Sequence, residues 1–266
     1  MGYLHEGHFS LIKKARSEND VVIVSIFVNP AQFGPNEDLS RYPRNIERDL
    51  EMLKKLSVDI VFTPSVNEMY PTVFATYVDP TGPLVNVAEG ASRPGHFRGV
   101  ATVVLKLFQI IRPIQAYFGQ KDAQQAAVIK RMVTDFNLPV TLHILPIIRE
   151  ADGLALSSRN SYLNPQDRKT AVILYKALQA GRKIFESHLK ANPSLAIKAI
   201  SGIIQTEPCV QLDYIQIRDP DTFTELKTLK APALLLIAAK VGSVRLIDNF
   251  LLRRDGTWDT GIIKKN

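Results

Sequence analysis

The 266-residue sequence has a single cysteine, Cys209. One cysteine excludes an internal disulfide framework and is typical of proteins in a reducing compartment. No motif surrounds Cys209, so we expect it to be a small buried apolar side chain. Long apolar runs are missing too, since the longest, Val21–Val28 and Ala233–Ala239, have only the length of strands. The N-terminus also lacks a basic segment followed by an apolar one. These absences predict a cytoplasmic protein that does not enter a membrane.

A concentrated basic surface is a further absence, although the net charge is +7. Lysine and arginine alternate with aspartate and glutamate, as in Arg44–Lys55, and no basic stripe with interleaved aromatic residues occurs. Such scattered charge does not favour nucleic-acid binding. A small substrate that carries phosphate explains the positive surplus as well.

The N-terminal stretch 1–12 has the most distinctive chemistry. His5-Glu6-Gly7-His8 leads directly into an apolar pattern of helical period, formed by Phe9, Leu11, Ile12 and Ala15. The first N–H groups of a helix lack partners, and with the helix dipole they form an anion site. Imidazoles there can donate to phosphate oxygens, and glycine lets a nucleotide approach the backbone. The pattern outlines the His-x-Gly-His turn of nucleotidylyl transferases.

Two other interpretations of this stretch stay open. His5 and His8 can be neighbours on a helical surface without a task, or an i,i+3 pair that shares a metal ion. A metal site needs a third ligand nearby, and Glu6 points away from the face that the two histidines share. The rest of the chain has to decide.

Strands and helices alternate along the first 145 residues. Val21–Val28 is a β-branched run typical of a buried parallel strand, and a helix over 45–56 with Ile46, Leu50, Leu53 and Leu56 on one face leads to the strand Val58–Phe62. Open sheets of this kind bind ligands at the carboxyl ends of their strands. Further elements follow in the same alternation: a helix Val100–Ile111, a strand Gln115–Phe118, a helix Ala123–Phe136 and a strand Val140–Leu145.

After Pro146 the pattern changes to helices followed by strands. A long helix starts at Asn164-Pro165 and a second spans Ser194–Gln205. The expected strands are Val210–Ile217, Ala233–Ala239 and Val244–Ile247. We therefore predict an α/β protein with a Rossmann-like, doubly wound parallel sheet in residues 1–147 and a smaller α+β domain in residues 148–266.

Four polar loops fall at predicted strand ends or at the domain junction. Besides the histidine turn these are Asn29–Phe33, where Gln32 offers an amide, Gly119–Asp122, and Ser157-Ser158-Arg159. Lys121 can neutralise a transferring phosphate and Asp122 can hold a ribose hydroxyl, while the hydroxyls and guanidinium of the last loop can wrap a triphosphate. Each loop alone can also be an ordinary turn, cap or linker. Four of them in this order indicate a common site.

Seven motifs resemble the pantothenate synthetase family in order and over nearly the whole chain. They are Met-Gly-x-Leu-His-Glu-Gly-His, Ser-Ile-Phe-Val-Asn-Pro-x-Gln-Phe, Tyr-Pro-Arg, Glu-Gly-Ala-Ser-Arg-Pro-Gly-His-Phe-Arg-Gly-Val, Phe-Gly-x-Lys-Asp-x-Gln-Gln, Gly-Leu-Ala-Leu-Ser-Ser-Arg-Asn and Arg-Leu-Ile-Asp-Asn. The resemblance implies an ATP-dependent ligase of the coenzyme A pathway, a relative of the class I nucleotidylyl transferases. Such enzymes join pantoate to ATP as pantoyl adenylate, release pyrophosphate, and let β-alanine displace AMP.

The resemblance also implies the site residues. His8 is the expected proton donor or transition-state stabiliser, His5 a phosphate contact, Gln32 a contact of pantoate and β-alanine, and Gln125 a contact of pantoate. The expected catalytic set is His5, His8, Lys121, Ser157, Ser158 and Arg159. The expected ATP contacts are Met1, Gly2, Tyr3, Leu4, His5, Glu6, Gly7, His8, Gly119, Gln120, Lys121, Asp122, Ile148, Leu156, Ser157, Ser158 and Arg159. Mg²⁺ is expected with the triphosphate, and the partners are small molecules and a second copy of the chain.

Chemistry supports this assignment, because AMP turns a carboxylate into a good electrophile. The site has to spread the negative charge that develops at the α-phosphate, a task for donors such as His8, Lys121, Ser157 and Arg159. The adenylate must also be kept from water, which predicts that the second domain acts as a lid. Arg93, His96 and Arg98 form a basic loop for which a supporting role at the site, a subunit interface and a purely structural role all stay open.

One departure from the family pattern concerns the N-terminus. A strand and a Pro-Thr pair normally precede the Met-Gly of the histidine turn, so neighbours such as Val21–Val28 are expected to expose unpaired edges. We expect that the recorded start is too late, because every downstream motif is intact. The alternatives are a non-catalytic, truncated nucleotide-binding module, or another nucleotidylyl transferase with a different acceptor. Gln32 and Gln125 argue against the latter, since they suit a small hydroxy acid.

Overall fold

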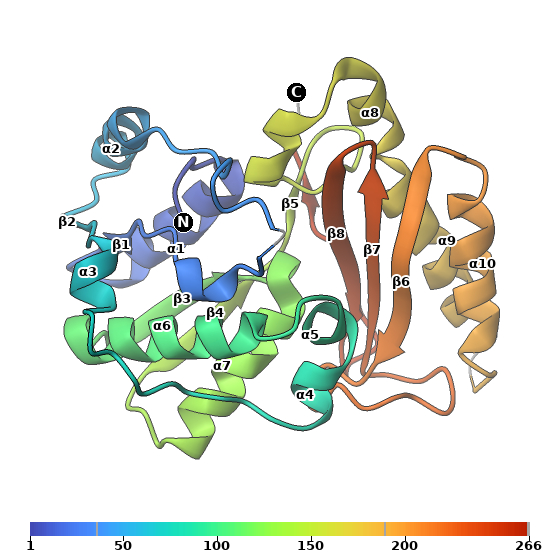
Figure 1. Ribbon diagram of the computed structural model, residues 1–266. Coiled ribbons are helices and arrows are strands. Elements are labelled where there is room, and N and C mark those ends of the chain that lie inside the picture. The colour runs from blue at the N-terminus through green and yellow to red at the C-terminus, as the bar shows by residue number, and fades with distance from the viewer. Residues whose placement is uncertain (36, 189, 265–266) are drawn as a thin grey trace. The chain divides into compact units, whose positions relative to one another are not determined.

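The computed structural model describes residues 1–35, 37–188 and 190–264 and falls into two compact units (Figure 1). The first unit comprises residues 1–119 and 125–145, and the second comprises 120–124 and 146–266. Residues 265 and 266 of the predicted second domain lie outside the described residues. The domain boundary at residue 148 stays a prediction. In the described part of the chain, no helix has the length and apolar character needed to cross a membrane.

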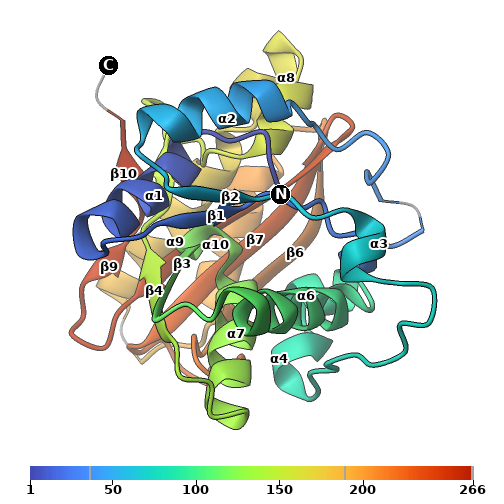
Figure 2. The ribbon, with the colours of Figure 1, turned by 90° about the vertical axis from the view of Figure 1, so that its left-hand side faces the viewer.

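The first unit consists of helices around two short parallel ladders. β1 (Ile23–Ser25) pairs with β2 (Ile60–Phe62), and β3 (Gln115–Gly119) pairs with β4 (Thr141–Leu145). Figure 2 shows this unit with α1 and α2 beside β1 and β2. Its helical elements are α1 (Glu6–Glu18), η1 (Pro30–Gln32), α2 (Ile46–Lys55), α3 (Val66–Met69), α4 (Pro83–Asn86), α5 (Ala88–Ser92), α6 (His96–Ile111) and α7 (Ala123–Asp135), the last of which starts at the crossover between the units.

The parallel ladders are less buried than their sequences suggest. Among the described residues β1 pairs only with β2, and β3 only with β4. Val21 and Ile23 are 59% and 36% exposed, although parallel strands of this composition are normally covered on both faces. In the same stretch Val22 and Phe27 are buried, and the expected effect of a missing neighbouring strand stays a prediction.

Helix α2 presents a different face from the one predicted. Asp49 and Leu53 are its buried residues, whereas Ile46 and Leu50 are 39% and 43% exposed. The predicted apolar stripe Ile46, Leu50, Leu53 and Leu56 was therefore wrong in its first half. Polar contacts explain the difference, because the Asp49 carboxylate accepts hydrogen bonds from the backbone of the N-terminal turn and must therefore face inward.

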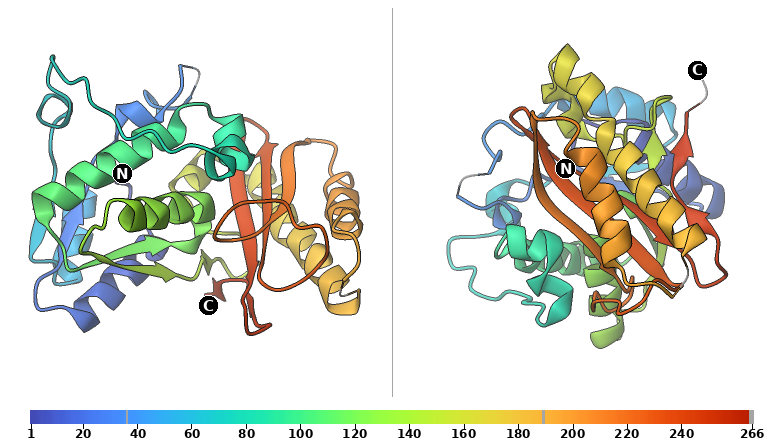
Figure 3. Two further views of the ribbon diagram at one scale, coloured as in Figure 1. Left: turned by 90° about the horizontal axis from the view of Figure 1, so that it is seen from below. Right: turned by 90° about the vertical axis from the view of Figure 1, so that its right-hand side faces the viewer.

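The second unit is built on an antiparallel sheet with the order β6-β7-β8-β9. Its strands are β6 (Val210–Arg218), β7 (Ala233–Val241), β8 (Val244–Leu252) and β9 (Trp258–Asp259), and a separate parallel pair joins β5 (Ile148–Arg149) to β10 (Ile262–Ile263). The helical elements are η2 (Gln120–Asp122), η3 (Ser158–Tyr162), α8 (Pro165–Thr170), α9 (Ile173–Ser187) and α10 (Ser194–Ile204). α9 and α10 lie side by side along the sheet (Figure 3) and bury the face of β7 that carries Ala233, Leu235 and Ile237.

The predicted α+β character of the second unit is confirmed, with two corrections. The single long helix after Pro165 is divided into α8 and α9 by a turn at Ala171-Val172. Cys209 is exposed in the turn before β6, so the prediction of a buried side chain was wrong. A residue without a motif carries no signal of whether its backbone lies in a strand or in the turn before it.

Candidate active site

The histidine turn forms the N-terminus of α1, as predicted. His5 is the N-cap, and its Nδ1 accepts from the Gly7 amide at 3.2 Å, while His8 Nδ1 accepts from the His5 amide at 3.2 Å. A neutral imidazole whose Nδ1 accepts a hydrogen bond carries its proton on Nε2. Both rings therefore present an Nε2–H donor, and their centroids are 4.0 Å apart. The arrangement suits an anion.

This geometry disfavours the metal-pair interpretation of the two histidines. A ligating imidazole offers a lone pair, but both Nδ1 lone pairs already accept backbone N–H groups. Across residues 1–35, 37–188 and 190–264 no group of three or more His, Cys, Asp or Glu residues could hold a metal ion. The turn is therefore a site of hydrogen-bond donors.

Asp49 anchors the turn from α2. Its two carboxylate oxygens accept from the backbone amides of Tyr3 and Leu4 at 2.7 and 2.8 Å, and the residue is only 1% exposed. Tyr3 has a φ of 52°, a conformation that a β-carbon disfavours and that these bonds hold in place. Sequence analysis missed Asp49. The available signal was a carboxylate one helical turn before the buried Leu53.

The side chain of Gln32 is buried and held in a defined orientation. Its Nε2 donates to Met1 Sδ at 3.1 Å, and its Oε1 accepts from Asn29 Nδ2 at 3.2 Å. Asn29 Oδ1 in turn accepts from the Tyr70 hydroxyl at 2.8 Å. Burial, together with the nearby Tyr77, raises the pKa of Tyr70 to about 12 despite the hydrogen bond to Asn29, so Tyr70 remains a donor. The structure thus brings together Met1 and Gln32, two predicted site residues.

The residues of the predicted basic loop hold the backbone of Gln32, although His96 and Arg98 lie in the first turn of α6 and not in a loop. His96 Nδ1 lies 2.8 Å from the Gln32 carbonyl oxygen, and Arg93 lies 3.1 Å from His96 Nε2. Burial and the Arg93 charge lower the pKa of His96 to about 4, so the ring is neutral. Because Arg93 can only donate, His96 Nδ1 carries the proton and donates to Gln32. Arg98 instead stacks on the Tyr77 ring at 4.0 Å.

Glu37 is the acidic partner of Arg93. It accepts from Arg93 Nη2 at 2.6 Å and from Arg93 Nε at 2.9 Å, a two-pronged contact. Burial acts to raise the pKa of Glu37, but the hydrogen bonds and charge of Arg93 outweigh it and the pKa is lowered. Of the three open roles for the basic loop, these contacts favour support of the site for Arg93 and His96.

The second unit carries the other predicted phosphate-handling residues. Gln120, Lys121 and Asp122 form η2, and Ser157 caps η3 by accepting from the Arg159 amide at 3.3 Å. Leu156 donates its amide to the Ile148 carbonyl at 2.9 Å, so these two predicted ATP contacts are neighbours. The side-chain amide of Gln120 donates to Asn249 Oδ1 at 3.1 Å, and the Gln120 carbonyl accepts from Asn249 Nδ2 at 3.0 Å.

Gly119 and Gln125 flank this segment and belong to the first unit. Gly119 is the last residue of β3, and Gln125 is half-buried near the start of α7. Besides Asp49, sequence analysis missed Asn29, Tyr70 and Asn249. The first and last lie inside the Asn-Pro-x-Gln and Arg-Leu-Ile-Asp-Asn motifs, so a polar residue within a motif was the signal.

Comparison with known proteins decides between the remaining interpretations. Residues 1–251 match the family described as Pantoate-beta-alanine ligase. The chain belongs to this family. It is 55% identical over 252 residues to the pantothenate synthetase of Roseiflexus castenholzii, covering 95% of this chain and 90% of the relative. It is 51% identical over 255 residues to that of Carboxydothermus hydrogenoformans, covering 96% and 90%.

Solved pantothenate synthetases share the fold. The crystal structure of the Thermus thermophilus enzyme has a TM-score of 0.91 at 49% identity and covers 94% of this chain and 90% of that chain. The Francisella tularensis pantoate-beta-alanine ligase has a TM-score of 0.77 at 42% identity, with 94% and 87% covered, and was crystallised with β,γ-ATP and β-alanine. The predicted fold class is confirmed, and the chain is an ATP-dependent pantoate–β-alanine ligase.

Proposed function

We propose that this chain ligates pantoate to β-alanine through pantoyl adenylate, using the predicted residues. In the first step a pantoate carboxylate oxygen attacks the α-phosphorus of ATP, and the bond to pyrophosphate breaks. In the second step the β-alanine amine attacks the acyl carbon, the bond to the AMP oxygen breaks, and the nitrogen loses a proton. Family membership and the donor geometry of the histidine turn support this route.

The histidine turn is proposed to bind ATP through Met1–His8 and to stabilise the transferring phosphate. The Nε2–H groups of His5 and His8, which lie at the positive end of the α1 dipole, are donors for negatively charged oxygens. Donors fixed before the reaction stabilise developing charge without reorganisation. His8 is the proposed proton donor and His5 the proposed phosphate contact, and the Asp49 anchor supports the rigidity this requires.

Pantoate is proposed to lie against the amides of Gln32 and Gln125, with Gln32 also touching β-alanine. The side-chain and backbone contacts of Gln32 support its part, because an amide held from both sides binds a small polar acid at low entropic cost. Gln125 is proposed on the motif alone.

The triphosphate is proposed to be bound by Lys121, Ser157, Ser158 and Arg159, with further ATP contacts from Gly119, Gln120, Asp122, Ile148 and Leu156. Lys121 and Arg159 bring positive charge, and the Leu156–Ile148 hydrogen bond sets the loop that carries the two serines. Mg²⁺ is proposed to enter as part of the MgATP substrate, held by phosphate oxygens and water. A lid action of the second domain, a homodimer and a cytoplasmic location also belong to the proposal, on the family resemblance.

The Nδ1 contact of His8 allows a sharp test of its role. In His8→Asn, the side-chain oxygen can replace Nδ1 as the acceptor for the backbone N–H of His5, but the Nε2–H donor is lost. In His8→Gln, the side-chain nitrogen can replace the Nε2–H donor, but the acceptor for the backbone N–H of His5 is lost. We expect His8→Asn to fold normally and to lose roughly 100- to 1,000-fold in pantoate-dependent pyrophosphate release, as for removal of one transition-state donor.

The exposed His188 provides the matched control. His188→Asn should release pyrophosphate at the wild-type rate. The measurement follows pyrophosphate from ATP, Mg²⁺ and pantoate, and then AMP and pantothenate after β-alanine is added. A folded His8→Asn variant with the wild-type rate would overturn the role of His8, and a wild-type chain whose pyrophosphate release does not require pantoate would overturn the adenylate route.

A further inference from the structure

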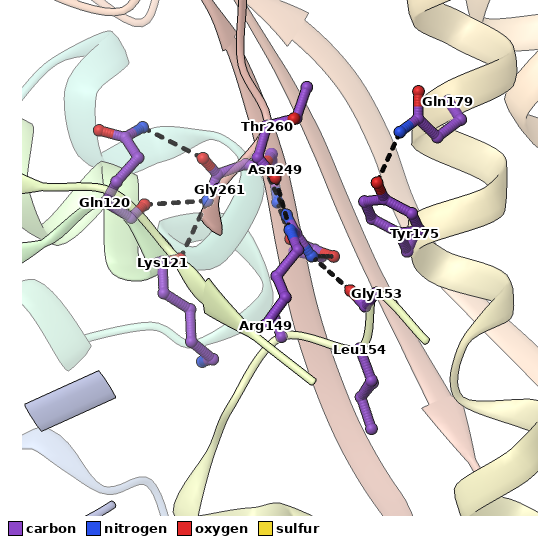
Figure 4. Close-up of polar contacts among 12 residues, drawn as sticks. Gln120, Lys121, Arg149, Gly153, Leu154, Tyr175, Gln179, Asn249, Thr260 and Gly261 are labelled. Carbon is purple, nitrogen blue, oxygen red and sulfur yellow. Dashed lines mark hydrogen bonds and ion pairs between the residues drawn. The ribbon is translucent and has the colours of Figure 1, made fainter. Parts of the chain in front are cut away.

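Asn249 holds the turn that carries Lys121, although the two are far apart in sequence. Its Nδ2 donates to the carbonyl oxygens of Gln120 and Lys121, both at 3.0 Å. Its Oδ1 accepts from Gln120 Nε2 at 3.1 Å. Figure 4 shows these contacts converging on Asn249. A residue of β8 thus fixes two successive peptide groups of η2 within the second unit.

The chemistry of these contacts requires an amide of this length. Two carbonyl acceptors need two donors, and the Gln120 amide needs an acceptor beside them. Asparagine provides both kinds of group, whereas aspartate is acceptor-only and a hydroxyl has one donor. Asn249 is only 1% exposed, so water does not readily replace a lost contact.

Asn249 is itself held rigidly. Its backbone N–H donates to Asp248 Oδ1 at 2.7 Å, and Asp248 forms a two-pronged ion pair with Arg149 at 2.6 and 2.8 Å. The Arg149 guanidinium is fully buried and lies 4.8 Å from the Tyr175 ring centroid and 5.3 Å from that of Phe250. Asn249 is therefore supported by a buried ion pair whose guanidinium lies against two aromatic rings.

Arg149 extends the same support to the other ATP loop. Its Nη1 donates to the Gly153 carbonyl at 3.0 Å, and its backbone forms a β-bridge with Ala155, just before the predicted ATP contact Leu156. The Arg149–Asp248–Asn249 cluster thus contacts η2 on one side and the loop leading to Ser157 on the other.

We propose that Asn249 is a positioning residue that sets the direction of the Lys121 ammonium for attack at the α-phosphate. The proposal rests on the phosphate-binding role of Lys121 given above. A lysine ammonium is a point charge on a flexible stem, so the backbone from which it starts decides where it is held. Stabilisation of developing charge depends on groups placed before the reaction, and shells that support them matter accordingly.

The test compares Asn249→Asp with wild type in the full chain. The substitution preserves shape but removes both donors and places carboxylate oxygens against two carbonyl oxygens. We expect kcat/KM for ATP in pyrophosphate release to fall about 10- to 100-fold, the cost of a misplaced group, while KM for β-alanine is unchanged. The matched control is Asp213→Asn, which weakens the exposed ion pair with Arg245 in the same sheet and should leave all constants unchanged.

A merely structural role predicts a different pattern. It would lower the melting temperature and the fraction of active protein, with equal effects for every substrate. If Asn249→Asp does not fold, Asn249→Ala, which removes the donors without adding charge, is measured in its place with the same expectation. A folded variant with wild-type kcat/KM for ATP, or with equal losses for ATP and β-alanine, would overturn the proposal.

A double-mutant cycle with Lys121→Ala shows whether Asn249 acts through Lys121. If it does, adding Asn249→Asp to Lys121→Ala costs little more than Lys121→Ala alone. Losses that multiply would overturn the proposal and leave the role of Lys121 intact. If Lys121→Ala itself has the wild-type rate, the proposed function of Lys121 fails instead.

Discussion

Gly99→Ala tests whether the contact between α6 and η1 sets the position of Gln32. A β-carbon at Gly99 would lie 2.1 Å from the carbonyl oxygen of Ala31 and 2.6 Å from the backbone nitrogen of Gln32. Ordinary contacts between heavy atoms are about 3.5 Å, so the two backbones have to separate by on the order of 1 Å. The neighbour is backbone, which cannot rotate away as a side chain can.

This displacement has two expected costs. Overpacking lowers the free energy of unfolding by about 1–3 kcal/mol, against a gain of up to about 1 kcal/mol for replacing glycine inside a helix. A shift of about 1 Å in a substrate-positioning residue lowers kcat/KM for pantoate about 100-fold. Because Asn29 donates to the Gly99 carbonyl at 3.1 Å, the hydrogen bond that orients the Gln32 amide should weaken as well.

Urea denaturation and initial rates of pyrophosphate release at varied pantoate measure both effects. Gly202→Ala is the matched control, because Gly202 lies in α10 and a β-carbon there meets nothing within 4 Å. That variant should gain about 0.5–1 kcal/mol of stability and keep its kinetics. A Gly99→Ala variant with the stability and pantoate kinetics of wild type would refute the reasoning.

Two further predictions concern buried charge. His96 is neutral when folded, with a pKa of about 4 against 6.5 when unfolded, so its contribution is complete above pH 6.5 and is lost as the pH falls towards 4. At pH 5 the loss is about 2 kcal/mol, and urea titrations should show that His96→Asn flattens this dependence; an unchanged slope would contradict the assignment. Arg149→Met leaves the Asp248 carboxylate buried without its partner and should cost about 3–5 kcal/mol in unfolding free energy. Adding Asp248→Asn should recover part of it, and a loss below about 1 kcal/mol for the single change would contradict the account.

Features that neighbouring residues determine could be predicted from the sequence. The His5–His8 turn was predictable because a cap, a glycine and a helical apolar pattern stand next to one another, and the structure has a cap at His5. The division into a parallel α/β part and an antiparallel α+β part was predictable from the order of helices and strands. Both follow from rules that operate within one turn or one strand.

Local signals marked some of the supporting residues, but their partners could not be predicted because the contacts join distant parts of the chain. Asp49 reaches Tyr3 over 46 residues, and Asn249 reaches Gln120 over 129. The inward-facing Asp49 also explains the wrong face predicted for α2, since apolar periodicity assumes that a carboxylate faces water. Hydrogen bonds to backbone groups elsewhere in the chain overrode that pattern.

The most direct test of the ligase mechanism uses pantoate with oxygen-18 in its carboxylate. If the carboxylate attacks the α-phosphorus and β-alanine then displaces AMP, one labelled oxygen must appear in AMP and none in pyrophosphate. Mass spectrometry of AMP from wild-type protein with ATP, Mg²⁺, labelled pantoate and β-alanine reads this directly. We predict singly labelled AMP in an amount equal to the pantothenate formed. Pantothenate formed together with unlabelled AMP would contradict the adenylate route.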